Sequence, residues 1–278
     1  MRMSVCRAYA LLTLGTLGLV SVPSTVSAQY RPAATTGAIA EDYHIEASYN
    51  WWRAEPSLIV NSESLGIIGT NIDLISDLGI EKHKLSMLNL TLKPSKKHRL
   101  RFQRLPIKYE TDAFPVSRSF VFNGQSYRVG LPVTTTVDFT TYSFGYQYDF
   151  LHFPKGFVGA GINLKYTNVD VNLESPIGSE FISATAPIPA FSFAGRGYVT
   201  PEFSIEAELS LFRIPDSISE QLDGDGSYTD FDLHGTYNFN KNVGAQMGWR
   251  RTKIFYNVDL DTGDLQFKGL YFGGVVRY

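Results

Sequence analysis

Apolar and polar residues alternate one for one along the segment Ser204–Leu211. Successive side chains of a β-strand point to opposite faces, so a strand here has one apolar face and one polar, acidic face. A helix would scatter both classes around its axis, because its period is 3.6 residues. The segment therefore predicts a strand. The odd positions hold Ile205, Ala207, Leu209 and Leu211, and the even positions hold Ser204, Glu206, Glu208 and Ser210.

The same two-residue rhythm recurs over most of the chain and predicts about ten strands. Short and long connections alternate between them, which is typical of an up-and-down meander. The short connections are rich in turn formers or charge, as in Pro94–Lys97 and Thr200–Glu202. The predicted strands are Tyr43–Arg53, Lys84–Lys93, His98–Tyr109, Thr134–Asp149, Gly156–Leu173, Ile188–Val199, Phe203–Arg213, Ser227–Asn238, Val243–Phe255 and Leu265–Tyr278.

Aromatic side chains are abundant, with 16 Tyr, 19 Phe and 3 Trp, yet no stretch after Ala28 is apolar enough for a membrane helix of about 20 residues. A membrane barrel reconciles these facts, because its outer face is apolar while its interior is polar. We therefore expect an all-β fold, a closed antiparallel up-and-down transmembrane barrel of about ten strands, with eight or twelve as alternatives. Aromatics near strand ends, among them Trp51, Trp52 and Tyr271, suggest two girdles at the membrane surfaces.

Two of the long connections have features of their own. Phe120–Tyr127 contains Asn123-Gly124 between alternating residues, a strong hairpin signal. This segment is either a protruding extracellular hairpin or an added pair of barrel strands. Within the connection 54–83, the segment Leu58–Ile80 is apolar for an exposed loop, so we expect it to fold over the barrel mouth.

The beginning of the chain is typical of an export signal. Arg2 and Arg7 precede an apolar run, and small residues follow at Val26–Ala28. We expect a signal peptide at residues 1–28, a short periplasmic lead-in at 29–41 and the barrel at 42–278. Cys6, the only cysteine, precedes the apolar run, so the mature chain has no cysteine for lipidation, a disulfide or a thiolate metal site.

The last predicted strand ends Leu270-Tyr271-Phe272-Gly273-Gly274-Val275-Val276-Arg277-Tyr278. This stretch resembles the C-terminal signature of bacterial outer-membrane β-barrels, an amphipathic strand that closes on an aromatic residue. The resemblance implies that Phe272 and Tyr278 belong to the signal read by the barrel-assembly machinery. In size and strand rhythm the chain is similar to the small OmpA/OmpW-like barrels of the outer-membrane β-barrel domain superfamily.

Asp232-Leu233-His234 is the best candidate for chemistry, because an aspartate can orient a histidine that activates water. The omptin proteases, similar in size, use such a couple, but the second aspartate pair of that family is not found here. The alternative is that Asp232 and His234 belong to a luminal network of charges that fills a narrow barrel. The other expected members are Lys165, Arg196, Glu206, Glu208, Asp230 and Arg250.

Other sites have weaker support. His83 and Ser86 lack a third catalytic group, and the acidic loop Asp216–Gly226 does not follow the EF-hand spacing for calcium. We therefore predict no metal and no cofactor. The chain has 25 Lys and Arg against 27 Asp and Glu, so no basic excess recommends nucleic acid.

These observations predict a porin-like, non-enzymatic barrel in the outer membrane of a Gram-negative envelope, with a structural role or a narrow passive channel for small solutes. Its expected partners are outer-membrane lipid and, during biogenesis, the barrel-assembly machinery. A membrane-embedded hydrolase using Asp232 and His234, acting on peptide or lipid, is the first alternative. A soluble periplasmic lipocalin-like barrel, with apolar side chains inside, is the second.

Deleting Tyr278, or changing it to Asp, is expected to reduce assembly, because the closing strand and its recognition signal both end there. Tyr278→Phe keeps the aromatic ring and serves as the control. The measurement is the amount of heat-modifiable protein in outer-membrane fractions. Undiminished assembly of the deletion variant would contradict the assembly role of this residue.

Overall fold

The computed structural model describes residues 41–278 except 63–67, 82–83, 216, 218, 220–223 and 259–260. The predicted signal peptide and residues 29–40 of the lead-in lie outside the described residues, as do His83 and most of the acidic part of the loop 216–226. Within the described part of the chain, no helix has the length and apolar character that crossing a membrane requires.

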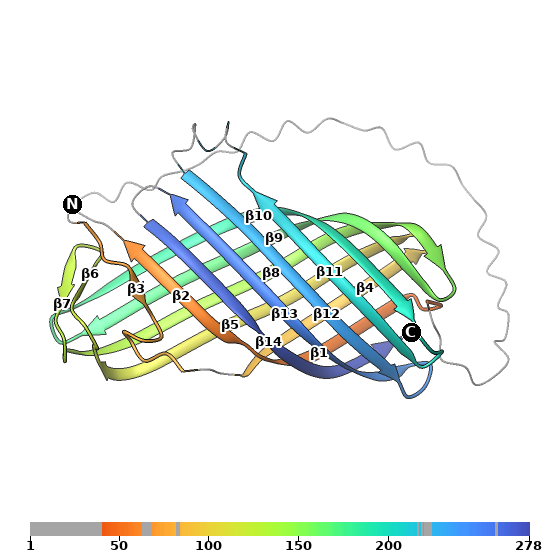
Figure 1. The fold of residues 1–278 in the computed structure, drawn as a ribbon, viewed down its shortest axis with the longest axis horizontal. Helices are drawn as coiled ribbons and strands as arrows, with labels where there is room; N and C mark the ends of the chain where they lie inside the picture. The colour runs from red at the N-terminus through yellow and green to blue at the C-terminus, as the bar shows by residue number, and fades with distance from the viewer. Residues whose placement is uncertain are drawn as a thin grey trace. The chain divides into compact units, whose positions relative to one another are not determined.

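Ten antiparallel strands close into an up-and-down barrel (Figure 1). The last strand pairs back with the first, from Glu46 opposite Arg277 to Trp52 opposite Tyr271. This closure confirms the predicted fold and the count of ten over eight or twelve. The strands are β1 (Ile45–Arg53), β4 (Lys84–Ser95), β5 (His98–Pro115), β8 (Pro132–Phe153), β9 (Gly156–Ser175), β10 (Gly178–Tyr198), β11 (Phe203–Arg213), β12 (Gly224–Asn238), β13 (Val243–Val258) and β14 (Asp261–Arg277).

The connection 54–83, expected to be a loop, contains two further strands. β2 (Glu55–Ser62) pairs with β14 and continues the line of β1 after a break at Ala54, and β3 (Ile72–Asp73) pairs with β2. The expectation of a loop was wrong here because Pro56, Leu58 and Val60 keep the two-residue rhythm and are buried. The barrel wall therefore extends beyond the point where β1 ends.

The Asn-Gly segment forms a hairpin outside the barrel sheet. β6 (Phe120–Phe122) and β7 (Gln125–Tyr127) pair only with each other in a separate two-stranded sheet. Asn123 and Gly124 have φ values of 47° and 79°, the left-handed conformation that a tight hairpin turn requires. This confirms the hairpin and excludes the added barrel pair. The hairpin lies at the loop end, the end of the barrel opposite the C-terminus (Figure 1).

The outer face of the barrel has an apolar belt next to the turn end, where the tight connections lie. On β8 the outward residues run from Tyr148 to Tyr142 and are aromatic, and beyond them Thr140 and Asp138 are polar. Tyr142 stands opposite Tyr166 of β9, so the belt ends at the same level on both strands. Each barrel strand contributes exposed apolar residues to this belt, for example Trp51, Leu88, Leu100, Phe144, Ile162, Phe193, Leu211, Leu233, Met247 and Phe272.

At the same level the inner face changes from polar within the belt to apolar beyond it. Inside the belt, β8 turns Thr141, Ser143, Gln147 and Asp149 inward, and beyond the belt it turns Val133, Val137 and Phe139 inward. The alternation is continuous, but the polar and apolar faces exchange sides. The prediction of a polar interior is therefore correct only for the belt, and the part beyond it, which we call the extension, has the apolar core and polar surface of a water-soluble barrel.

The extension explains why the strands are longer than a membrane needs. β8, β9 and β10 have 22, 20 and 21 residues, whereas about 9–11 tilted residues cross a bilayer. Residues of the segment 68–81 pack against this core, with Leu74, Leu78 and Ile80 buried. They belong to the apolar segment Leu58–Ile80, which was expected to fold over the barrel mouth.

An ion pair ties the segment 68–81 to the connection before β6. Arg118 Nη2 lies 2.6 Å from Asp77 Oδ2, and Arg118 Nε donates a hydrogen bond of 2.9 Å to Oδ1. Burial raises the pKa of the Asp77 carboxyl, but hydrogen bonds from Arg118 and the backbone N–H of Asp73 outweigh this effect, so the pKa lies below its ordinary value. The charged form of Asp77 thus stabilises this contact at neutral pH.

Two substitutions on the same face of β8 test the level at which the belt ends. Phe144→Arg is expected to cost about 2–4 kcal/mol, because it places a charge in lipid. Thr136→Arg, eight residues closer to the loop end, is expected to change stability by less than about 0.5 kcal/mol, because the extension faces water. Urea titrations of protein refolded into lipid vesicles measure both. Equal destabilisation would contradict the belt boundary.

Candidate functional site

The eight predicted luminal residues all border one cavity of about 90 Å³ inside the belt. They come from five neighbouring strands, β9 to β13, and project from the inner face because each occupies an inward position of its strand. A cavity of this size has room for a few water molecules. The eight residues are Lys165, Arg196, Glu206, Glu208, Asp230, Asp232, His234 and Arg250.

Asp230 is the centre of one cluster. Arg250 holds its carboxylate with two hydrogen bonds, of 2.9 Å from Nε and 2.6 Å from Nη2. Thr252 and Tyr228 donate hydroxyl hydrogen bonds of 2.9 and 3.1 Å to the same carboxylate, and Lys165 Nζ lies 3.5 Å away. The carboxylate is therefore saturated with donors, as a buried charge must be.

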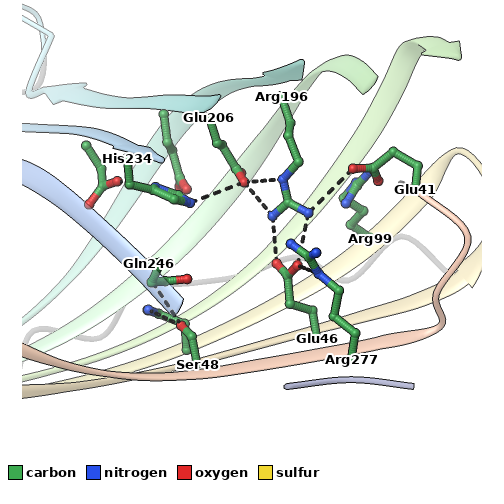
Figure 2. A network of polar contacts seen from close by, with 12 residues as sticks. Glu41, Glu46, Ser48, Arg99, Arg196, Glu206, His234, Gln246 and Arg277 are labelled. Carbon is green, nitrogen blue, oxygen red and sulfur yellow. Dashed lines mark hydrogen bonds and ion pairs between the residues drawn. The ribbon is translucent and has the colours of Figure 1, made fainter. Parts of the chain in front are cut away.

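Arg196 is the centre of a second cluster, shown in Figure 2. Its Nε donates a hydrogen bond of 2.7 Å to Glu206, and Nη2 lies 2.7 Å from Glu46. Nη1 donates to the Tyr43 hydroxyl at 2.7 Å and lies 3.4 Å from a Glu41 oxygen. One guanidinium thus joins three carboxylates from β1, β11 and the residues before β1.

Two more arginines complete this cluster, and neither was predicted to face the lumen. Arg99 Nε donates a hydrogen bond of 2.7 Å to Asp149, and its Nη2 donates one of 2.7 Å to Glu41. Arg277 Nε lies 2.5 Å from Glu46 (Figure 2). Glu46, Arg99 and Arg277 each occupy an inward position in the two-residue alternation of their strands, so the sequence could have shown that they face the lumen. Glu41, which the sequence placed at the end of the lead-in, lies in the lumen and is 5% exposed.

His234 and Asp232 form the couple that their spacing suggested. His234 Nδ1 lies 2.7 Å from Asp232 Oδ1, which also accepts a hydrogen bond of 2.8 Å from the Tyr271 hydroxyl. The other ring nitrogen, Nε2, lies 3.6 Å from Glu206. A general base needs one nitrogen directed at a substrate, but here both nitrogens face carboxylates.

Aromatic side chains close the lumen at the level where the belt ends. Trp52 and Tyr271, expected in the membrane girdles, point inward instead and are 0% and 2% exposed. Trp52 packs against Phe267, and Phe267 against Phe139, with ring centroids 6.5 and 5.7 Å apart. The girdle assignment of Trp52 and Tyr271 was wrong because distance from a strand end does not determine which face a residue occupies.

The expected assembly residues lie on the outer face or at the chain end. Tyr278 is 82% exposed, and its carbonyl accepts hydrogen bonds of 2.7 and 2.9 Å from the backbone N–H groups of His44 and Ile45. Phe272 is 50% exposed, and its ring lies 5.6 Å from that of Trp51. Among the residues that the structure describes, no three His, Cys, Asp or Glu side chains are grouped so as to hold a metal ion.

No family model matches the chain, and a comparison with curated proteins finds no match. Among solved structures, the outer membrane protease OmpT from Escherichia coli aligns with a TM-score of 0.51 at 9% identity, over 87% of this chain and 99% of that one. Ail of Yersinia pestis (TM-score 0.38, 9% identity, 84% and 99% coverage) and the Pseudomonas putida toluene transporter TodX (TM-score 0.33, 8% identity, 85% and 89% coverage) align less well.

The closed sheet and the alignment with OmpT define the class: the chain has the fold of a bacterial outer-membrane β-barrel. Within that class the barrel has ten strands, β1, β4, β5 and β8 to β14. At 9% identity the likeness to OmpT concerns the fold alone.

Arg196→Ala is expected to destabilise the barrel by about 3–5 kcal/mol, and by less if water enters, because it removes the shared partner of Glu41 and Glu206, which are buried, and of Glu46, which is partly buried. Arg196→Lys keeps the charge but not the planar fork, so an intermediate loss is expected. Arg128→Ala, at an exposed position, is the control. The measurement is the urea midpoint in lipid vesicles, and equal midpoints for the two alanine variants would contradict a stabilising role.

Proposed function

We propose that the chain spans the outer membrane as a closed, non-enzymatic barrel with a structural role. One observation carries this proposal: the described part of the lumen is filled. The Arg196 cluster occupies the turn end, the aromatic layer of Trp52, Phe267 and Phe139 lies at the other limit of the belt, and the cavity between them measures about 90 Å³. A filled lumen leaves no open channel, which favours a structural role in which the protein acts through its outer surfaces.

The belt supports the membrane location. Its residues are exposed and apolar around all ten strands, while charged side chains inside are paired, which is the distribution expected of a barrel in lipid. A lipocalin-like barrel requires the reverse, and within the belt the structure has Ile205 outward and Glu206 inward. In the proposed orientation the tight turns face the periplasm and the extension faces the outside. Export would use residues 1–28 as a signal peptide.

A passive channel requires the Arg196 cluster to open. An ion passing this level would have to separate Arg196 from carboxylates at 2.7 Å while these groups remain mostly buried. The test is conductance in planar lipid bilayers. We expect wild-type protein to show no steady conductance, and a stable open state of the wild type would contradict the structural role.

A membrane-embedded hydrolase remains the second candidate, because one observation favours it. The Asp232–His234 couple is formed at 2.7 Å, on a barrel whose fold is that of a protease, OmpT. Against this candidate, the couple borders a cavity that has room for a few water molecules but not for a peptide.

Asp232→Asn and His234→Ala separate the two candidates. Under the structural role we expect both variants to lose about 1–3 kcal/mol of stability, because Asp232 is hydrogen-bonded to His234 and Tyr271. We also expect that neither the wild type nor the variants hydrolyse peptide or lipid. Asp170→Asn, on the outer face of the extension, is the control. Unfolding midpoints are paired with peptide and lipid hydrolysis assays. Wild-type hydrolysis that vanishes in both variants at unchanged stability would favour the hydrolase.

A further inference from the structure

Four basic side chains gather on the outer face where the apolar belt ends towards the loop end. Arg53, Lys268 and Arg251 each occupy the first outward position beyond the belt residues Trp51, Leu270 and Trp249. Lys84 lies beyond Leu88 and Ser86 on β4. All four cations are exposed. We call Arg53, Lys84, Arg251 and Lys268 the basic patch.

The strand register brings these cations together in pairs of like charge. Arg53 stands directly opposite Lys84, and Arg251 directly opposite Lys268. Because all four lie on the same face, both pairs repel, and like charges directly opposite each other destabilise a sheet. Arg53 lies on β1 and Lys268 on β14, and β14 pairs with β1 and with β2, the strand that follows β1. The two pairs are therefore neighbours on the sheet and form one patch.

The strand pairing places one carboxylate opposite the patch. Among the described residues directly opposite a patch residue, Glu55, which faces Lys268, is the one anion, so strand pairing sets one anion against four cations. Arg251 donates hydrogen bonds of 3.1 and 2.7 Å to Gln266, an uncharged amide. Further out, Lys253 and Asp264 pair at 3.2 Å and cancel each other. The excess is local, because the chain as a whole has a net charge of −2.

We propose that the basic patch binds the phosphate-bearing headgroup of a membrane lipid whose acyl chains lie against the belt beside it. The belt surface next to the patch includes Trp51 and Phe272, whose rings lie 5.6 Å apart. A lipid can make both contacts, because its phosphate oxygens bind the arginines and lysines and its acyl chains lie on the aromatic surface. A soluble anion would contact only the basic side chains. This inference rests on the proposed membrane location.

The test compares two variants that lose the same charge at opposite ends of the barrel. The patch variant carries Arg53→Gln, Lys84→Gln, Arg251→Gln and Lys268→Gln. The control variant carries Lys96→Gln, Lys97→Gln, Lys155→Gln and Lys241→Gln, all exposed at the turn end. Each protein is reconstituted in phosphatidylcholine vesicles with spin-labelled phosphatidic acid or spin-labelled phosphatidylcholine, and electron paramagnetic resonance measures how strongly each label associates with the protein.

We expect wild type and the control variant to prefer phosphatidic acid by about tenfold, and the patch variant to show little preference, because each juxtamembrane cation attracts anionic lipid. Added salt should weaken the preference by screening. Inorganic phosphate at the same ionic strength should have no further effect, and specific displacement by it would overturn the lipid assignment. Equal preference in the two variants would overturn the patch.

The phosphatidylcholine label separates this inference from the proposed function. A barrel that spans the bilayer immobilises a shell of neighbouring lipid whatever its headgroup. If no protein immobilises either label, the membrane location fails. If phosphatidylcholine is immobilised but phosphatidic acid is not preferred, the barrel stands and the basic patch has no lipid selectivity.

Discussion

The pairing of β1 with β14 is the constraint on which the rest of the structure depends. In hydrocarbon an unpaired backbone edge costs several kcal/mol per group, so the sheet must close. Closure at ten strands makes a narrow lumen, and the inward side chains of the belt have to fill it. Because those side chains include Arg99, Arg196 and Glu206, filling the lumen also means neutralising charge, and the two ion-pair clusters follow.

The same two-residue alternation continues from the part of the barrel that faces lipid into the part that faces water. Within the belt the outer face meets lipid and the inner face carries charge, whereas in the extension the outer face meets water and the inner face is apolar. Along β8 the exchange occurs between Tyr142 and Thr140 on the outside and between Thr141 and Phe139 on the inside. No bulge marks this point in the pairing with β9, so the change lies in the choice of residues and not in the backbone.

The sequence predicted the ten strands and the hairpin because both depend on local signals, the two-residue period and an Asn-Gly turn. Parity gives the face of a strand, and the eight residues that were predicted to face the lumen border one cavity. The sequence did not reveal that Arg196 contacts Glu41 or that Arg196 and Arg277 share Glu46, because parity gives no information about contacts across the lumen. The exchange of faces was readable in Thr134, Thr136 and Asp138, but the predicted barrel had its polar residues on the inner face along the whole of each strand.

The Arg196 cluster draws its members from both ends of the chain, Glu41 and Glu46 before or within β1 and Arg277 at the end of β14. These groups are far apart in the chain, so the cluster cannot form while the last strand is unplaced. In an incomplete sheet the same charges stay hydrated and contribute little. The complete cluster therefore adds to the stability of the barrel only once β1 and β14 have paired, so closing the sheet and neutralising the charges of the lumen are one event.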